Sequence, residues 1–205
     1  RDINRFPWAG RLAGSWDDIR AEWDGFTQAG GQLPHLRDLL DEDQGSDGPW
    51  KAGLLISKGK PATRLAERFP TTVERTLDVP GIWSALWSVL PPGTELPEHQ
   101  GPNAGVLRFH LGVDCPEHSA LRVNDTVLPY QDKRAVLFDD TALHEAWNRG
   151  STDRVTLFLE VLRPASGRSD LLNRATQRLL ALDRRYRDAP ARADEWDAAL
   201  NHGLF

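Results

Sequence analysis

The sequence contains no methionine and only one cysteine, Cys115, among its 205 residues. A single cysteine excludes a disulfide framework within the chain and favours a reducing compartment, so we expect a cytoplasmic protein. No apolar run approaches the length needed to cross a bilayer, and no signal peptide is recognisable within these residues. We therefore expect no membrane partner.

The chain also lacks an excess of positive charge. Its 25 Lys and Arg residues are outnumbered by 30 Asp and Glu residues, which gives a net charge of -5. This balance gives no support for a nucleic-acid partner, and we expect none. The sequence has no internal repeat and no low-complexity tract. Its hydrophobic content of 40% is that of a globular domain with a proper core.

The first part of the chain reads as short helices around one strand. We expect irregular structure at 1–14, then a helix at 15–28 that Ser15 caps and whose apolar residues recur at helical spacing. The elements expected next are a short helix at 33–41, a mobile acidic loop at 41–49, a strand at 50–57, and short helices at 61–68 and 71–77, the last capped by Thr71.

Beyond residue 82 the pattern changes to short β-like runs separated by Pro, Gly, Asn and Asp. Many short strands with turn signals between them are typical of a sandwich or barrel. The sequence therefore predicts a mainly β protein with a jelly-roll, cupin-like fold and flanking helices. The expected strands are 82–90, 94–100, 105–113, 119–123, 126–129, 133–138 and 153–162.

Two of these runs place charged residues on one strand face. Apolar side chains alternate with Arg108 and His110 in one run, and with Arg154 and Thr156 in another. Because neighbours on a strand point to opposite faces, each polar pair shares a face. Polar faces within otherwise apolar strands predict a polar pocket inside the barrel.

The C-terminal part is again helical in pattern. We expect a helix at 166–187 and a second, short helix at 191–200. Residues 1–164 would form one domain, and 165–205 would be appended helices that pack on it. Bracing of the barrel is the expected role of these helices, and a homodimer contact is the alternative. The apolar positions of the longer helix are Leu172, Ala175, Leu179, Leu182 and Tyr186.

Two histidines, His99 and His144, each lie at the end of a strand-like run. Imidazole is a good ligand for iron, zinc and copper, and a common non-haem iron site uses two histidines and one carboxylate. The carboxylate usually stands two positions after the first histidine, where this chain has Gly101. Spacing alone therefore leaves open both a metal site and two ordinary core histidines.

A longer set of motifs resembles one family. These motifs are His99-Gln100-Gly101-Pro102-Asn103, Leu107-Arg108-Phe109-His110-Leu111-Gly112, Phe138-Asp139-Asp140-Thr141, His144-Glu145, Asn148 and Arg154. Together they resemble the aspartyl/asparaginyl β-hydroxylases, which are Fe(II)- and 2-oxoglutarate-dependent oxygenases on a double-stranded β-helix. The resemblance covers roughly residues 50–164, with weaker similarity from Pro7 onward.

The resemblance implies an iron site with two protein ligands. His99 and His144 would be the ligands, and the family pattern also lacks the carboxylate, so Gly101 is no departure from it. Water would take the remaining position, with Asp140 as its partner. His99, His144 and Asp140 are thus the expected catalytic residues.

The resemblance also implies a site for 2-oxoglutarate. Arg154 and Ser88 would bind its distal carboxylate, and bidentate geometry explains the choice of Arg over Lys. Arg108 and His110 would bind near its metal-binding end. Glu98 and Glu145 adjoin the two histidines but should point to the opposite strand faces.

The expected function is that of an Fe(II)/2-oxoglutarate dioxygenase. It would use O2 to hydroxylate the β-carbon of an aspartyl, asparaginyl or related amino-acid unit that is free, carrier-bound or peptidyl, in a biosynthetic pathway. Family members that act on lipid acyl chains usually carry membrane helices, and none is visible here. An iron halogenase on the same scaffold and a non-catalytic barrel that binds a small acid are the alternatives. Arg122, Lys133 and Arg134 are candidate contacts to an acidic substrate or carrier.

Overall fold

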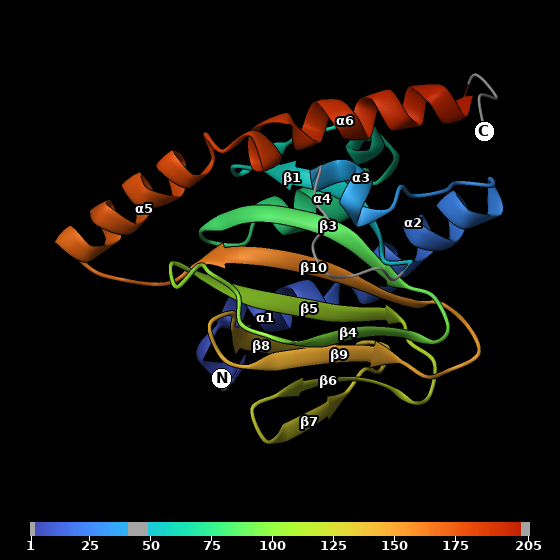
Figure 1. The fold of residues 1–205 in the computed structure, drawn as a ribbon, viewed down its shortest axis with the longest axis horizontal. Helices are drawn as coiled ribbons and strands as arrows, with labels where there is room; N and C mark the ends of the chain where they lie inside the picture. The colour runs from blue at the N-terminus through green and yellow to red at the C-terminus, as the bar shows by residue number, and fades with distance from the viewer. Residues whose placement is uncertain (1–2, 41–48, 202–205) are drawn as a thin grey trace.

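A computed structural model describes residues 3–40 and 49–201, and Figure 1 shows two antiparallel β-sheets with helices around them. The larger sheet has the order β2-β1-β3-β10-β5-β8 and the smaller the order β4-β9-β6-β7. This double-sheet arrangement with flanking helices is the jelly-roll architecture that the sequence predicts. The expected loop at 41–49 lies, apart from Pro49, outside the described residues.

The strand bounds agree closely with the expected runs. The larger sheet contains β1 (Lys51–Ser57), β2 (Lys60–Pro61), β3 (Ile82–Leu90), β5 (Val106–Asp114), β8 (Ala135–Asp139) and β10 (Arg154–Leu162). The smaller contains β4 (Thr94–His99), β6 (Ser119–Val123), β7 (Thr126–Pro129) and β9 (His144–Asn148). Strand β9 was not expected, because His144, Ala146 and Asn148 form its buried face and only one of them is apolar.

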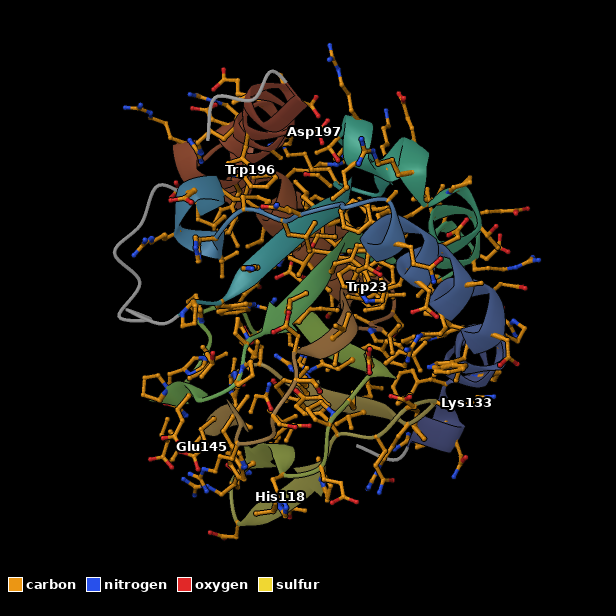
Figure 2. The ribbon with its side chains drawn as sticks, turned by 90° about the vertical axis from the view of Figure 1, so that its right-hand side faces the viewer. Trp23, His118, Lys133, Glu145, Trp196 and Asp197 are labelled. Atoms are coloured by element: carbon orange, nitrogen blue, oxygen red, sulfur yellow. The ribbon has the colours of Figure 1, made fainter. Side chains whose placement is uncertain are left out.

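Helices cover the outer face of the larger sheet. Helices α1 (Pro7–Gly14), α2 (Trp16–Gln28) and α4 (Pro70–Leu77) pack there with β1, β3, β5 and β10 in one apolar core. Figure 2 shows Trp23 of α2 between the helices and this sheet, with its ring centroid 4.9 Å from that of Trp87. Since the outer face takes the apolar side chains, Arg108, His110 and Arg154 point inward, as their alternation predicts.

The irregular structure expected at 1–14 is wrong. Ile3–Arg5 form a short 3-10 helix, η1, and α1 begins at Pro7, a residue that suits a first helical turn because its missing N–H has no partner there anyway. Trp8 and Leu12, four positions apart, are buried against the sheet. A helix of barely two turns is too short for its spacing to stand out in the sequence.

The shorter elements also differ in detail from expectation. Helix α3 is Leu36–Leu40, and the helix expected at 61–68 is a 3-10 turn, η2 (Arg64–Arg68). Thr71 does not cap α4, which begins at Pro70. Instead the backbone N–H groups of Thr71 and Thr72 donate to the Glu22 carboxylate at 2.7 and 2.8 Å. A side chain from α2 therefore caps α4, which local sequence cannot reveal.

The expected helix at 166–187 is interrupted. Helix α5 (Arg168–Leu180) ends before 181–183, and α6 (Arg184–Asn201) follows with Pro190 inside it. Helix α6 packs on α3 and β1, and Arg192 Nε donates to the Leu39 carbonyl at 2.6 Å. The apolar positions of α5 are largely exposed, so they do not make the contact that braces the barrel, and the alternative of a homodimer contact stays a prediction.

We predict that Glu22→Ala lowers the free energy of unfolding by about 1–2 kcal/mol. The substitution leaves the first N–H groups of α4 without their anionic acceptor, which is worth this much at a helix N-terminus. Urea denaturation at neutral pH measures the change. Glu74→Ala, on the exposed side of the same helix, is the matched control. Equal effects of both variants would contradict the capping role.

Candidate active site

The two histidines face each other across adjacent strands. In the antiparallel pair β4 and β9, His99 lies opposite His144, and their ring centroids are 4.2 Å apart. Each Nδ1 lies close to a backbone carbonyl two residues earlier, at 2.7 Å from Pro97 O and 2.8 Å from Ala142 O. Because a carbonyl oxygen only accepts, both Nδ1 atoms carry the proton, and each Nε2 keeps its lone pair.

This donor set fits a metal ion bound by two imidazoles. Burial lowers the pKa of His144, and the neighbouring His99 lowers it further, so the neutral, ligating form is favoured. The backbone carbonyls fix the ring orientation in the way that is usual for metal-binding histidines. Among the described residues no group of three His, Cys, Asp or Glu side chains is placed to hold a metal, so the protein would supply two ligands.

Asp140 stands beside this pair at the end of β8. Its side chain is almost fully buried, and Oδ1 lies 4.0 Å from His144 Nε2. A Cβ at Gly101 would overlap the Asp140 carboxylate, and Gly101 N–H donates to Asp140 O at 2.8 Å. Glycine at 101 therefore leaves the space that Asp140 fills.

A charged network holds the Asp140 carboxylate in place. Arg108 donates from Nε to Oδ1 at 2.8 Å and from Nη2 to Oδ2 at 3.3 Å. Its Nη1 pairs with Glu160 at 2.6 Å, and Glu160 also accepts from Ser84 Oγ at 2.5 Å. Three N–H groups of Arg108 are thus committed to carboxylates, and its contact with a co-substrate stays a prediction.

Arg154 is a buried cation with no counter-anion among the residues that the structure describes. It is 2% exposed, and among the described residues no carboxylate lies within ion-pair distance of it. Nη1 donates to Thr156 Oγ1 at 3.2 Å, the guanidinium lies 4.6 Å from the Tyr130 ring centroid, and Nε has no partner. Burial lowers the pKa of Arg154. An unpaired buried charge is costly, so this arrangement is suited to an anionic ligand.

Two further polar groups complete the pocket. His110 Nδ1 lies 2.8 Å from the Tyr130 hydroxyl, and its Nε2 is buried without a partner. Burial, with Arg154 nearby, holds the pKa of His110 well below its ordinary value, so the ring is neutral. Ser88 is buried opposite Thr156 in the sheet and accepts from Trp50 Nε1 at 3.0 Å.

All seven predicted site residues line one cavity of about 100 Å³ between the two sheets. That volume is small beside the ~300–1,000 Å³ of typical ligand pockets. The lining residues are Trp50, Ser88, Leu96, His99, Arg108, His110, Leu121, Tyr130, Phe138, Asp140, His144, Ala146, Arg154 and Phe158. The cavity therefore brings together the histidine pair, the unpaired arginine and an apolar wall.

The sequence-based prediction missed several members of this site. Phe158 and Glu160 continue the alternation of Arg154 and Thr156 along β10, so extending that pattern would have found them. Trp50 and Tyr130 lie just outside strands, where alternation gives no direction. No local signal in the sequence places either of them at the site.

The acidic neighbours of the two histidines point outward, as expected. Arg122 of β6 pairs with Glu98 at 2.6 Å and with Glu145 at 2.8 Å, and Figure 2 shows Glu145 near the surface of the smaller sheet. Lys133 pairs with Asp17 at 3.0 Å. These pairs occupy two of the three basic residues considered as substrate contacts.

Comparison with known proteins identifies relatives of this chain. Residues 13–164 match the family model "Aspartyl/Asparaginyl beta-hydroxylase". The ornithine lipid ester-linked acyl 2-hydroxylase of Rhizobium tropici is 31% identical over 96% of this chain and 72% of its own length. The human aspartate beta-hydroxylase domain-containing protein 2 is 32% identical over 57% of this chain. The human aspartyl/asparaginyl beta-hydroxylase is 30% identical over 52% of it.

The chain covers very different shares of the lengths of these relatives. The chain spans only 34% and 14% of the two human proteins. Among solved structures, a predicted oxalate decarboxylase from Thermotoga maritima has a TM-score of 0.41 at 18% identity, covering 57% of this chain and 83% of that one. The Schizosaccharomyces pombe Cnp3 cupin domain has the same TM-score at 12% identity, covering 62% and 71%.

The family match includes every element that carries the site. It begins before α2 and ends just after β10, so it contains both sheets and all the residues that line the cavity. The motif residues that line the cavity are His99, Arg108, His110, Phe138, Asp140, His144 and Arg154. The chain belongs to the aspartyl/asparaginyl β-hydroxylase family.

Proposed function

We propose that the protein is an Fe(II)- and 2-oxoglutarate-dependent hydroxylase. The observation that carries this proposal is the buried Arg154, which has no counter-anion among the described residues and lines the same cavity as His99 and His144. A metal-binding pair and an unpaired guanidinium in one small cavity are complementary to a ligand that binds a metal at one end and carries a carboxylate at the other.

Each residue of the cavity would have a distinct task. The Nε2 atoms of His99 and His144 would hold the iron, which with O2 and 2-oxoglutarate supplies the oxidation of an unactivated C–H bond. Arg154 and Ser88 would bind the distal carboxylate of 2-oxoglutarate, where the planar guanidinium suits a bidentate contact. Asp140, held by Arg108, would accept a hydrogen bond from water beside the histidines.

The size of the cavity indicates that it would hold the co-substrate and not the whole substrate. About 100 Å³ suits a small diacid but not a peptide or lipid as well. The substrate would therefore approach from the histidine end, since His99 is exposed while Arg154 is deeply buried. Only the carbon to be oxidised needs to reach the site.

For the substrate we favour the acyl chain of a polar lipid. The Rhizobium tropici acyl 2-hydroxylase matches 96% of this chain and so extends well past residue 164, where the family model ends. The human relatives match little more than half of it. Sequence reasoning set lipids aside because no membrane helix is visible. No described helix is long and apolar enough to span a membrane, yet that relative acts on a lipid.

An aspartyl or asparaginyl unit is the second candidate, favoured by the names of the family and its animal members. Incubation with iron, 2-oxoglutarate and ascorbate, followed by mass spectrometry, distinguishes the two. We expect an acyl lipid to gain one oxygen with matching release of succinate. Oxygen gain on amino-acid units alone would reject the lipid assignment, and a chlorinated product in the presence of chloride would favour the halogenase alternative. Absence of 2-oxoglutarate binding would reject the proposal itself.

We predict that Arg154→Ala weakens 2-oxoglutarate binding by about tenfold to a hundredfold. The variant loses a charge-assisted contact worth roughly 1.5–3 kcal/mol. Calorimetry on the iron-loaded protein measures the change. Arg122→Ala, which removes an arginine that pairs only on the outer surface, is the control and should bind normally. Unchanged affinity in folded Arg154→Ala would contradict the assignment.

We predict that His99→Ala and His144→Ala each abolish retention of iron, because one imidazole remains where two are needed. Metal analysis after gel filtration measures the bound iron directly, without reference to turnover. The control is His118→Asn, in a turn outside the cavity. Full iron occupancy in either alanine variant would show that the metal lies elsewhere.

We predict that Gly101→Ala lowers the rate of hydroxylation by roughly tenfold to a hundredfold, as is usual when a group behind a metal ligand is displaced. The added methyl would overlap the Asp140 carboxylate and force it away from Arg108. Gly25→Ala in α2, where a Cβ meets nothing within 4 Å, is the control. Equal rates for Gly101→Ala and wild type would show that the position of Asp140 is unimportant.

A further inference from the structure

Helix α5 packs on the protein through its polar side. Gln177 is 1% exposed and exchanges two hydrogen bonds with the Asn103 side chain, at 2.8 and 3.0 Å. One turn earlier, Asn173 Nδ2 donates to the Gly105 carbonyl at 2.9 Å. Since residues 173 and 177 share one face of the helix, the face turned away from the barrel is the opposite one.

That outer face is apolar. Leu171 and Leu172 are each 71% exposed, Leu179 is 68% exposed, and Leu182 just beyond the helix is 64% exposed. Residues 171, 172, 175, 179 and 182 recur at spacings of three, four and seven, so they form one stripe. Leu180 of α5 and Tyr186 of α6, outside the stripe, are each 46% exposed. Elsewhere in the described chain, the exposed large apolar residues Leu77, Val127 and Leu143 are far apart in sequence. A concentrated apolar stripe indicates a binding surface.

Two arginines lie on the same side of α5 as this stripe. Arg168 and Arg178 are exposed and have no ion-pair partner among the described residues, whereas Arg174 pairs with Asp170 on the inner side. At 100° per residue, Arg178 falls beside the stripe, and Arg168 falls within it at its N-terminal end. The whole chain carries a charge of -5, so this local positive charge runs against the overall balance. Leucines together with free arginines are typical of helices that lie on anionic membranes.

The helix adjoins the entrance to the site. Asn103 and Gly105, which α5 contacts, belong to the segment that directly follows the proposed ligand His99. Tyr186, at the start of α6, is close enough to Arg108 to influence its pKa. Figure 1 shows α5 extending outward from the edge of the sheets, with its outer side unobstructed by the rest of the chain.

We propose that the outer face of α5, with Leu171, Leu172, Leu179, Arg168 and Arg178, docks on the surface of an anionic lipid bilayer. Thirteen residues span about 20 Å, too short for the ~30 Å bilayer core, so the helix would lie in the interface rather than cross it. A second copy of the chain is the poorer occupant, because a two-fold contact between two such faces brings unpaired arginines together.

Docking in this way would hold the histidine end of the barrel against the lipid surface. An acyl chain could then reach the iron site without leaving the bilayer entirely. This consequence rests on the proposed function, whereas the docking surface itself does not. The two are therefore tested separately, one by vesicle binding and the other by turnover.

The experiment is flotation of the full chain with vesicles of phosphatidylcholine alone or mixed with anionic phosphatidylglycerol. We expect binding to the mixed vesicles that weakens with added salt. The double variant Leu172→Gln/Leu179→Gln should bind on the order of tenfold less for each leucine removed. Arg168→Gln/Arg178→Gln should lose the preference for anionic vesicles. Leu77→Gln and Arg75→Gln, both exposed on α4, are the matched controls.

Circular dichroism first establishes that each variant is folded. Equal vesicle binding by wild type and the leucine variant, or no binding by either, would overturn the proposal. A dimer in sedimentation analysis that the leucine variant dissociates, without vesicle binding, would assign the face to a second copy instead. Arg154→Ala should bind vesicles like wild type, so a failure of the hydroxylase assignment leaves this result unaffected.

Discussion

The structure depends on keeping a guanidinium charged inside a barrel. Arg154 opens β10, which lies between β3 and β5 near the middle of the larger sheet, and its charge is removed from water without a carboxylate partner among the described residues. Within the described part of the chain, Thr156 and the Tyr130 ring compensate part of that loss. A bound dicarboxylate would supply the missing partner, and binding energy of that kind adds to folding stability. The same burial that costs stability without ligand would make the pocket selective for an anion.

The histidine end of the cavity differs from the Arg154 end, because there the charged side chains are paired. Arg108 lies between Asp140 and Glu160 and pairs with both. Glu160 therefore holds Arg108 in place, and Arg108 holds the Asp140 carboxylate beside the histidines. The antiparallel register of β4 and β9 sets the two imidazoles opposite each other, and the lack of a side chain at Gly101 admits Asp140. A one-residue slip of either strand would turn one histidine away. Strand register, more than any single contact, therefore defines the donor pair.

The residues that sequence alone could place are those governed by strand alternation. Arg108, His110 and Arg154 follow from period two within strongly apolar strands, and their inward direction is confirmed. Their partners could not be placed so well. Tyr130 and Trp50 lie beyond strand ends, where alternation gives no direction. Strand β9 has one apolar residue on its buried face. Glu22 caps helix α4, which begins 48 positions later in the sequence. In each case the deciding contact is long-range, so no window of sequence contains both partners.

Helix α5 also shows that a sequence pattern does not identify the long-range contacts of an element. Its leucines recur at helical spacing, which correctly predicts a helix, but spacing does not say what covers the apolar stripe. In the folded chain the covered face is formed by Asn173 and Gln177, and the leucines are left outside. Under the proposed function, the barrel interior would hold the co-substrate, and the rim and α5 would lie where a substrate arrives. The human relatives match little more than half of the chain, whereas the Rhizobium tropici acyl 2-hydroxylase matches 96% of it. We therefore infer that the parts of the chain outside the core shared with the human relatives would select the substrate.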